Sequence, residues 1–132
     1  MILIDTSAWI EFFRNRGATA ELVDVALRED EAAWCGPIAT ELRRGLRSPK
    51  ERAKVLPLLS GCHWLSQPAA LWEEAGDLGY ALRRKGLTVG TMDLLVATYA
   101  LSHDAQLLAV DRDFAAMEKK GVPLELVALD PS

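Results

Sequence analysis

The hydrophobic positions of the chain form short apolar runs that alternate with longer segments of helical spacing. The runs have the length of buried strands and are bounded by polar or turn-forming residues. They are Ile2–Ile4, Ala33–Cys35, Cys62–Leu65, Leu107–Val110 and Leu126–Leu129. Because helical segments separate these runs, the pattern predicts an α/β fold in which helices cover both faces of a central, mostly parallel sheet of about five short strands.

The segments between the runs carry the signals of helix ends. Ser48-Pro49-Lys50-Glu51 is typical of a capping box with proline at the first helical position, and Pro57 is expected to kink or end that helix. Another helix is expected to close near Arg28. A third has an apolar stripe at helical spacing and closes on a basic last turn before Gly86. Its stripe is Leu71, Ala75, Leu78 and Leu82.

Length and composition indicate one ordinary globular domain, covering residues 1–132. No apolar run approaches the roughly 18 residues of a membrane span, and the start "MILIDTSAW" has no basic region of a signal peptide. Cys35 and Cys62 have neither a disulfide framework nor metal-ligand spacing, so both are expected to be reduced and buried. These features predict a cytoplasmic protein.

The net charge of −4 conceals a separation of charges along the chain. Basic residues concentrate in residues 43–54 and 83–85. Such runs usually form solvated helix faces, but they also supply local basic patches for a phosphate backbone. A polyanionic partner is therefore compatible with the acidic total.

Two aspartates stand directly after predicted core strands. Asp5 follows Ile2–Ile4, and Asp111 follows Leu107–Val110. The carboxyl ends of parallel strands meet at one edge of the sheet, where the chemistry of such folds gathers. A single aspartate at this place is also a common turn or helix-cap residue, so the pair carries more weight than either member.

Two predicted helices add further acids. In "CGPIATELRRGL", Glu41 borders an apolar stripe that begins at Ile38. In "GTMDLLVATYALS", Thr91 is the expected N-cap, which places Asp93 in the first helical turn. The helix dipole favours a carboxylate there, so Asp93 also has a purely structural explanation.

We expect these acids to converge at one end of the sheet, together with Asp113. Two carboxylates ~4 Å apart repel by about 4 kcal/mol at an effective dielectric constant of ~20. Hard divalent cations such as Mg²⁺ or Mn²⁺ relieve this repulsion, and they prefer all-oxygen ligands. His63 lies within a predicted strand and His103 at a helix end, so both are expected to be structural, and a zinc site is not expected.

Four segments, in this order along the chain, carry a family resemblance: "LIDTSAWIEFF", "IATELRRG", "MDLLVATYA" and "LLAVDRDF". They resemble the motifs of PIN-domain ribonucleases and, more narrowly, of the VapC-type toxins of type II toxin–antitoxin systems. The resemblance implies a PIN-like three-layer α/β/α fold. It matches Asp5, Glu41, Asp93 and Asp111 to the acidic quartet of the family, and Asp113 to an additional acid.

The residues beside these acids also follow the family, with one departure. Thr6 or Ser7 matches the hydroxyl residue after the first acid. Val110 stands where members more often carry a small polar residue, and we expect it to alter the hydrogen bonding around the site without abolishing metal binding.

The resemblance implies a metal-dependent endoribonuclease that uses Mg²⁺, with Mn²⁺ as a substitute. Asp5 and Asp93 would hold the cation with help from Glu41 and Asp111, and Asp113 would serve as an outer or second-metal ligand. Hydrolysis by a metal-activated water would leave a 5′ phosphate and a 3′ hydroxyl. The arginines beside Glu41 would hold flanking phosphates; they are Arg43, Arg44 and Arg47.

Partners also follow from the resemblance. A cognate antitoxin would neutralise the toxin and place an Arg or Lys of its tail against the acidic site. Trp9, Ile10, Phe12 and Phe13 are the first candidates for its apolar docking surface, although at least two of them are expected in the core. A homodimer is a further expectation.

Two alternatives differ in chemistry. An aspartate-nucleophile phosphohydrolase usually carries a second aspartate two residues after the first, and here that position is Ser7. A catalytically silent PIN-fold domain that binds RNA or protein would have no reason to retain mutually repelling carboxylates. Metal-dependent cleavage separates this silent domain from the nuclease.

Overall fold

The computed structural model describes residues 1–129 as strands alternating with helices, as the hydrophobic pattern predicts. Four parallel strands form one sheet in the order β3-β2-β1-β4. The elements in chain order are β1 (Ile2–Ile4), α1 (Thr6–Phe13), α2 (Gly17–Arg28), β2 (Ala32–Trp34), α3 (Gly36–Gly45), α4 (Pro49–Ser60), β3 (His63–Trp64), α5 (Leu71–Arg84), α6 (Thr91–Ser102), β4 (Gln106–Leu108) and α7 (Arg112–Lys119).

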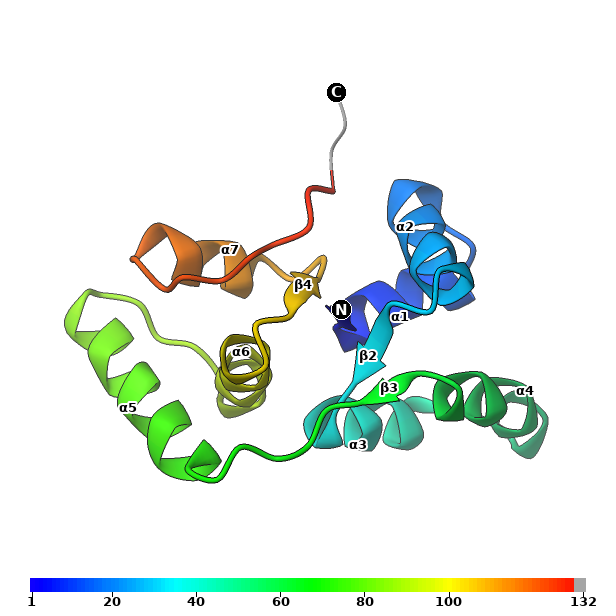
Figure 1. The fold of residues 1–132 in the computed structure, drawn as a ribbon, viewed down its shortest axis with the longest axis horizontal. Helices are drawn as coiled ribbons and strands as arrows, with labels where there is room; N and C mark the ends of the chain where they lie inside the picture. The colour runs from blue at the N-terminus through cyan, green and yellow to red at the C-terminus, as the bar shows by residue number, and fades with distance from the viewer. Residues whose placement is uncertain (130–132) are drawn as a thin grey trace.

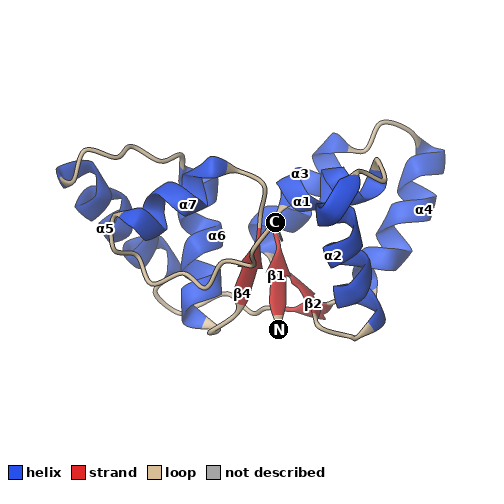
Figure 2. Cartoon of the chain, turned by 90° about the horizontal axis from the view of Figure 1, so that it is seen from above, coloured by secondary structure: helices blue, strands red, loops and turns tan. Residues whose placement is uncertain are grey.

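Helices gather in two groups around this sheet (Figures 1 and 2). One group contains α1 to α4, and the other contains α5 to α7, with the strands between them. The expected helix–sheet–helix arrangement is therefore confirmed. Within residues 1–129, no helix has the length and hydrophobicity needed to cross a membrane.

The predicted fifth strand is reduced to a single bridge. Leu126 pairs in parallel with Leu107 of β4, through hydrogen bonds from Leu107 N to Glu125 O (2.8 Å) and from Val127 N to Leu107 O (2.9 Å). Leu126 of the apolar run Leu126–Leu129 lies beside β4, but the prediction of a full strand there is wrong. One pair of hydrogen bonds fixes the segment without extending the ladder.

Most helix ends follow their local sequence signals. Ser48 caps α4 by accepting a hydrogen bond from Glu51 N (3.1 Å), and Gly86 adopts a φ of +85° directly after the end of α5. α2 ends at Arg28, as expected. Pro57 is expected to kink or end its helix, and of these two alternatives the second is wrong, because α4 continues to Ser60.

The core lies between the sheet and both helical groups. α6 is buried on all sides from Leu94 to Ala100, which makes it the central helix of its group. Phe114 and Met117 anchor α7 in the same core. Cys35 is free and buried as expected, whereas Cys62 is free but only half-buried, which corrects that prediction.

Candidate active site

Asp5 stands at the carboxyl end of β1 and caps α1. Its Oδ2 accepts hydrogen bonds from Ser7 N (3.1 Å) and Ser7 Oγ (2.6 Å). The residue is buried, with 4% of its surface exposed. Burial raises the pKa of Asp5, and the charges of Glu41 and Asp111 raise it further, while the two bonds from Ser7 oppose the shift. Asp5 therefore lies within electrostatic reach of both Glu41 and Asp111.

Ser7 also connects Asp5 to the segment that follows β4. Its Oγ accepts hydrogen bonds from Val110 N (3.0 Å) and Asp111 N (3.4 Å). Only the backbone of Val110 takes part, and its side chain is 42% exposed. The bond from Val110 N does not depend on the side chain, and the expected effect of valine in place of a small polar residue stays a prediction.

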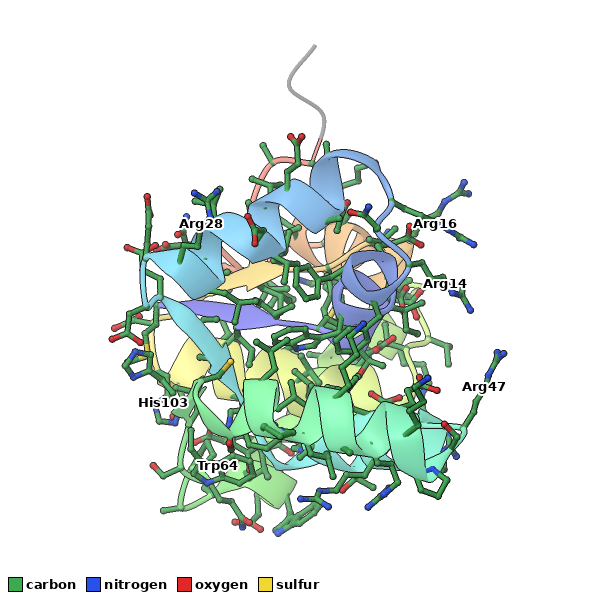
Figure 3. All side chains as sticks on the ribbon, turned by 90° about the vertical axis from the view of Figure 1, so that its right-hand side faces the viewer. Arg14, Arg16, Arg28, Arg47, Trp64 and His103 are labelled. Atoms are coloured by element: carbon green, nitrogen blue, oxygen red, sulfur yellow. The ribbon has the colours of Figure 1, made fainter. Side chains whose placement is uncertain are left out.

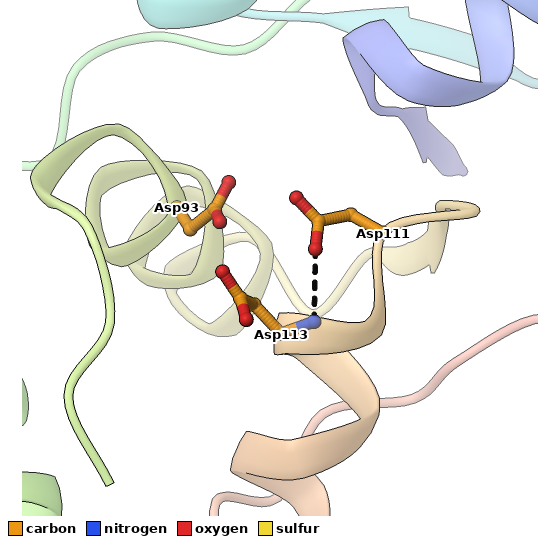
Figure 4. Close-up of side chains that lie close together, drawn as sticks. All are labelled: Asp93, Asp111 and Asp113. Carbon is orange, nitrogen blue, oxygen red and sulfur yellow. Dashed lines mark hydrogen bonds between the residues drawn. The ribbon is translucent and has the colours of Figure 1, made fainter.

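Three aspartates come together next to the segment that Ser7 holds (Figure 4). One carboxylate oxygen from each of Asp93, Asp111 and Asp113 lies within 4.8 Å of the others. Asp111 caps α7 by accepting a hydrogen bond from Asp113 N (2.9 Å), which places Asp113 in the first turn. Asp93 is in the first turn of α6. Two of the three aspartates thus lie in the first turn of a helix, where the helix dipole favours a negative charge.

Thr91 does not have the capping role that the sequence predicts. Gly90 is the N-cap of α6 and Thr91 is the first helical residue, with no side-chain cap bond at this helix end. Gly90 has an extended backbone conformation (φ −65°, ψ 154°) that fits an N-cap without a side chain. Asp93 remains in the first turn despite this shift of one residue.

The proximity of these acids changes the protonation of Asp93. Burial raises the pKa of Asp93 to about 8, with smaller contributions from a hydrogen bond with Asp113 and from the charges of Asp111 and Asp5. The carboxyl group is thus mostly protonated at neutral pH in the metal-free chain. A group shifted so far in a cluster of like charges is typical of a functional site.

Glu41 lies at the edge of this cluster. Its Oε1 accepts a hydrogen bond from Thr6 Oγ1 (3.1 Å), and its charge acts on Asp5. Among the residues that the structure describes, Asp5 and Glu41 are not members of the close group of three. The structure therefore arranges the predicted acids as a close triad with two further acids beside it.

The donor chemistry of the site fits a hard divalent cation. Every candidate ligand is a carboxylate oxygen, which suits Mg²⁺ or Mn²⁺. Burial raises the pKa of the nearby Cys35 thiol to about 12, so it is not a thiolate ligand at neutral pH. His63 Nε2 bonds Asp30 O and His103 Nε2 bonds Ser66 O, both at 2.8 Å, so each side chain ties two segments of the chain together.

The remaining predicted residues lie on the surface around the site. Arg43, Arg44 and Arg47 are exposed, and Arg47 alone of these lines a groove next to Thr6 and Glu41. Arg14 lines the same groove, although the sequence analysis did not select it. No pattern near Arg14 indicates this position, because α1 and α3 meet only in the folded chain.

The aromatic segment of α1 divides between core and surface. Trp9 is fully buried, so it is part of the core and not of a docking surface. Phe12 and Phe13 are half-buried against it, and Ile10 is 37% exposed. The last three therefore remain available at the surface.

The chain is thus an α/β protein with a cluster of acids at the carboxyl edge of a parallel sheet. Comparison with known protein families shows which of them has these features. The family described as "PIN domain" matches residues 2–120. The chain therefore belongs to the PIN-domain family.

Individual relatives show to which group within the PIN-domain family the chain belongs. Ribonuclease VapC11 of Mycobacterium tuberculosis is 37% identical over 119 residues, which cover 86% of this chain and 89% of the relative. Ribonuclease VapC32 of the same species is 37% identical over 126 residues, covering 94% and 96%. The chain thus belongs among the VapC ribonucleases of that family.

Solved structures agree on the fold. VapBC2 from Rickettsia felis, bound to a DNA fragment from its promoter, matches with a TM-score of 0.76 and 23% identity, over 98% of this chain and 100% of that chain. VapBC-1 from nontypeable Haemophilus influenzae matches with a TM-score of 0.76 and 21% identity, over 98% of both chains.

Proposed function

We propose that this chain is the endoribonuclease toxin of a toxin–antitoxin pair and hydrolyses RNA phosphodiester bonds with Mg²⁺, for which Mn²⁺ substitutes. The observation that carries the proposal is the group formed by Asp93, Asp111 and Asp113, in which the pKa of Asp93 is raised to about 8. The ribonuclease names of relatives at 37% identity support the choice of reaction.

The cation would be held by the close triad together with Asp5 and Glu41. A bound divalent cation neutralises phosphate charge and makes a water molecule a better nucleophile. Near neutral pH the chain itself has a proton to release at Asp93 before all three carboxylates can act as ligands. Two hydrogen bonds from Ser7 already orient the Asp5 carboxylate.

Two hydroxyl residues position the acids. Ser7 holds Asp5 and the backbone of Asp111 in one hydrogen-bonded unit. Thr6 orients Glu41, which leaves the other oxygen of this carboxylate available for a cation or a water molecule. Thr91 makes no cap bond, so we assign it no comparable role.

The test is cleavage of a mixed RNA pool by antitoxin-free chain, with Mg²⁺ or Mn²⁺ and with EDTA. Cleavage is expected to require the metal and to be lost in Asp93→Asn, which removes the charge at nearly constant shape. An Asp24→Asn variant is the matched control, because Asp24 is an exposed acid of α2 paired with Arg28. Folded wild-type chain that leaves both the pool and total cellular RNA intact with either metal would favour the silent domain.

An antitoxin is the proposed partner, because structurally similar chains are known as VapBC complexes. A Lys or Arg of its tail in the acidic group would stabilise the charged form of Asp93, as a metal would. Ile10, Phe12 and Phe13 are the proposed apolar docking residues. Co-expression with a candidate antitoxin, followed by copurification and loss of RNA cleavage, tests this pairing; cleavage that persists in the purified complex contradicts it.

A homodimer and a cytoplasmic site of action complete the proposal. Large aromatic side chains are exposed along β3 and α5, at Trp64 (56%), Trp72 (61%) and Tyr80 (61%), and such surfaces often mark interfaces. Light scattering on wild type and Trp72→Ala checks the oligomeric state.

The proposed cytoplasmic site of action fits the two free thiols, which suit a reducing compartment.

A further inference from the structure

A groove of about 350 Å³ adjoins the acidic site between α1, α3 and the turn into α4. Thr6 and Glu41 form one of its walls, and their hydrogen bond of 3.1 Å closes that wall. Thr6 follows Asp5 in the chain, and Glu41 acts on the pKa of Asp5. The groove and the acidic site therefore share a boundary.

The charge of the lining changes sign along the groove. Arg14 stands at the other end of α1 from Thr6, ~12 Å away at the usual helical rise. Arg14 and Arg47 both line the groove and extend from the same side of the molecule (Figure 3). Among the described residues neither forms an ion pair, whereas the neighbouring Arg16 lies 3.7 Å from Glu11.

One further acid, Glu51, lies in the lining near Arg47. Its Oε2 accepts a hydrogen bond from Arg47 N (3.2 Å), and it belongs to the first turn of α4, where the helix dipole offsets part of its charge. The two guanidinium groups therefore remain available to an anion at this end of the groove.

The floor between the acidic and basic ends is apolar. It is formed by Leu42, Leu46, Ile10 and Phe13. The Phe13 ring is held in place by stacking on Trp9, with ring centroids 5.7 Å apart and planes inclined by 20°. A rigid apolar floor beside two cations suits a nucleotide, whose base packs on apolar or aromatic side chains and whose phosphate binds guanidinium groups.

We infer that this groove is the subsite for a nucleotide of the RNA substrate that flanks the scissile phosphate, with a neighbouring phosphate bound by Arg14 and Arg47. The inference rests on the proposed nuclease function. The volume lies within the range of small-ligand sites, roughly 300–1,000 Å³. A nucleotide held there directs the adjacent phosphodiester toward the acids beyond Thr6 and Glu41. Arg14 thus becomes a substrate-binding residue.

RNA affinity gives the first test. Full-length chain carrying Asp93→Asn, which we expect to bind without cutting, is titrated with a labelled single-stranded RNA pool of random sequence over a range of salt. Arg14→Ala is expected to weaken binding roughly fivefold at low salt and to reduce the salt slope by about 0.7, the value for a single-strand phosphate contact. Arg47→Ala is expected to weaken binding and to reduce the salt slope by the same amounts.

The matched control is Arg16→Ala. It removes the same charge two residues from Arg14, but Arg16 does not line the groove and already neighbours Glu11. We expect it to leave the salt slope unchanged. Equal effects of Arg14→Ala and Arg16→Ala would overturn the inference, with thermal unfolding used to confirm that both variants fold.

Substrate trimming locates the nucleotide. In the cleaving wild-type background, Arg14→Ala is expected to raise KM with little change in kcat for an oligonucleotide that spans a mapped cut. Removing nucleotides one at a time from either end should abolish this effect at one step. An effect that survives every trimming contradicts the subsite.

The outcomes also separate the subsite from the proposed function. Wild-type chain that cuts no RNA defeats the nuclease proposal and the subsite together. Metal-dependent cutting with an unchanged KM in Arg14→Ala defeats the subsite alone. Because Ile10 and Phe13 are also proposed to dock the antitoxin, a loss of affinity for the antitoxin alone does not support the subsite: RNA affinity that stays unchanged in Arg14→Ala overturns the inference.

Discussion

Ser7 joins two parts of the chain through one oxygen atom. Its Oγ donates to Asp5 and accepts from the backbone of Val110 and Asp111, so β1 and the segment after β4 are fixed to each other at the acidic site. Loss of this hydroxyl leaves the Asp5 carboxylate with its backbone bond from Ser7 only. Loss of the Ser7 hydroxyl should therefore affect metal affinity more than it affects folding.

We therefore expect Ser7→Ala to lower Mn²⁺ affinity by roughly ten- to hundredfold, the usual effect of losing a residue that orients a metal ligand. Titration calorimetry measures the affinity. Ser60→Ala is the control, because the Ser60 hydroxyl bonds only Pro57 O of its own helix. Unchanged Mn²⁺ affinity in a folded Ser7→Ala chain would show that Ser7 does not position the ligands.

Asp93 makes stability depend on pH in the metal-free chain. Its pKa is about 8 in the folded chain and near 3.8 when unperturbed. Between these values the folded chain binds a proton that the unfolded chain has released, so stability falls as pH rises through this window. The shift comes mainly from burial of a carboxyl group that still meets solvent, which reduces its effect on stability.

Denaturant unfolding in EDTA at the two ends of this window measures the effect. We expect wild type to lose about 1–2 kcal/mol more than Asp93→Asn on going from the acidic to the alkaline end. Asn keeps the shape without the titration, so the difference between the two chains isolates Asp93. Parallel pH profiles would mean that Asp93 does not titrate there.

At the scale of the elements, α5 positions α6 through a close approach at Gly79. A Cβ placed on Gly79 would lie 2.8 Å from Leu94 Cδ1, whereas one on Gly76, a turn earlier, would meet nothing within 4 Å. Both glycines lie inside α5. Leu94 directly follows Asp93, so this contact also sets the place of the acidic residue.

The two glycines give a matched pair of substitutions. Gly76→Ala is expected to stabilise the chain by about 0.5–1 kcal/mol, through helix propensity alone. Gly79→Ala should gain the same propensity but lose about 1 kcal/mol, because the terminal methyl group of the buried Leu94 side chain must shift. Thermal unfolding of both variants checks this order, and equal stabilities would show that Leu94 moves aside at no cost.

Element positions were predictable where a local signal decides them. The proline and serine at the start of α4 and the glycine after α5 mark real helix ends. The errors arose where tertiary contacts decide. Leu126–Leu129 has the hydrophobicity of a strand, yet only Leu126 pairs with Leu107. Pro57 is tolerated inside α4, although its missing N–H costs the helix one hydrogen bond.

At the scale of the whole molecule, the acids come from four separate places: the end of β1, α3, the start of α6 and the start of α7. Binding of one cation to them cross-links both helical groups and the sheet. Ligand that binds only the folded chain stabilises it by mass action.

We expect Mn²⁺ at about a hundredfold excess over its Kd to raise the unfolding free energy by about 2.7 kcal/mol. Calorimetric melting with and without Mn²⁺ measures the change. Asp93→Asn should abolish most of it, whereas Asp24→Asn should keep it. A similar Mn²⁺ effect in both variants would place the cation outside the proposed site.

The acidic site was predictable in outline because Asp5 and Asp111 follow strands, and parallel strands bring their carboxyl ends together. The sequence did not predict that three of the acids form a close triad while Asp5 and Glu41 lie beside it. This arrangement depends on how α6 and α7 pack. The groove residue Arg14 was also beyond sequence reasoning. It meets Arg47 only through the packing of α1 against α3.

The length of chain between the acids governs when the site can form during synthesis. Asp5 ends β1, and the neighbouring strand β4 begins only at Gln106, much later in the chain. The triad further requires Asp111 and Asp113. A growing chain therefore cannot assemble the site before β4 and the start of α7 have been made. If the chain is the proposed nuclease, it would be inactive while β4 and α7 are still to be made, and the proposed antitoxin would have that interval in which to be present.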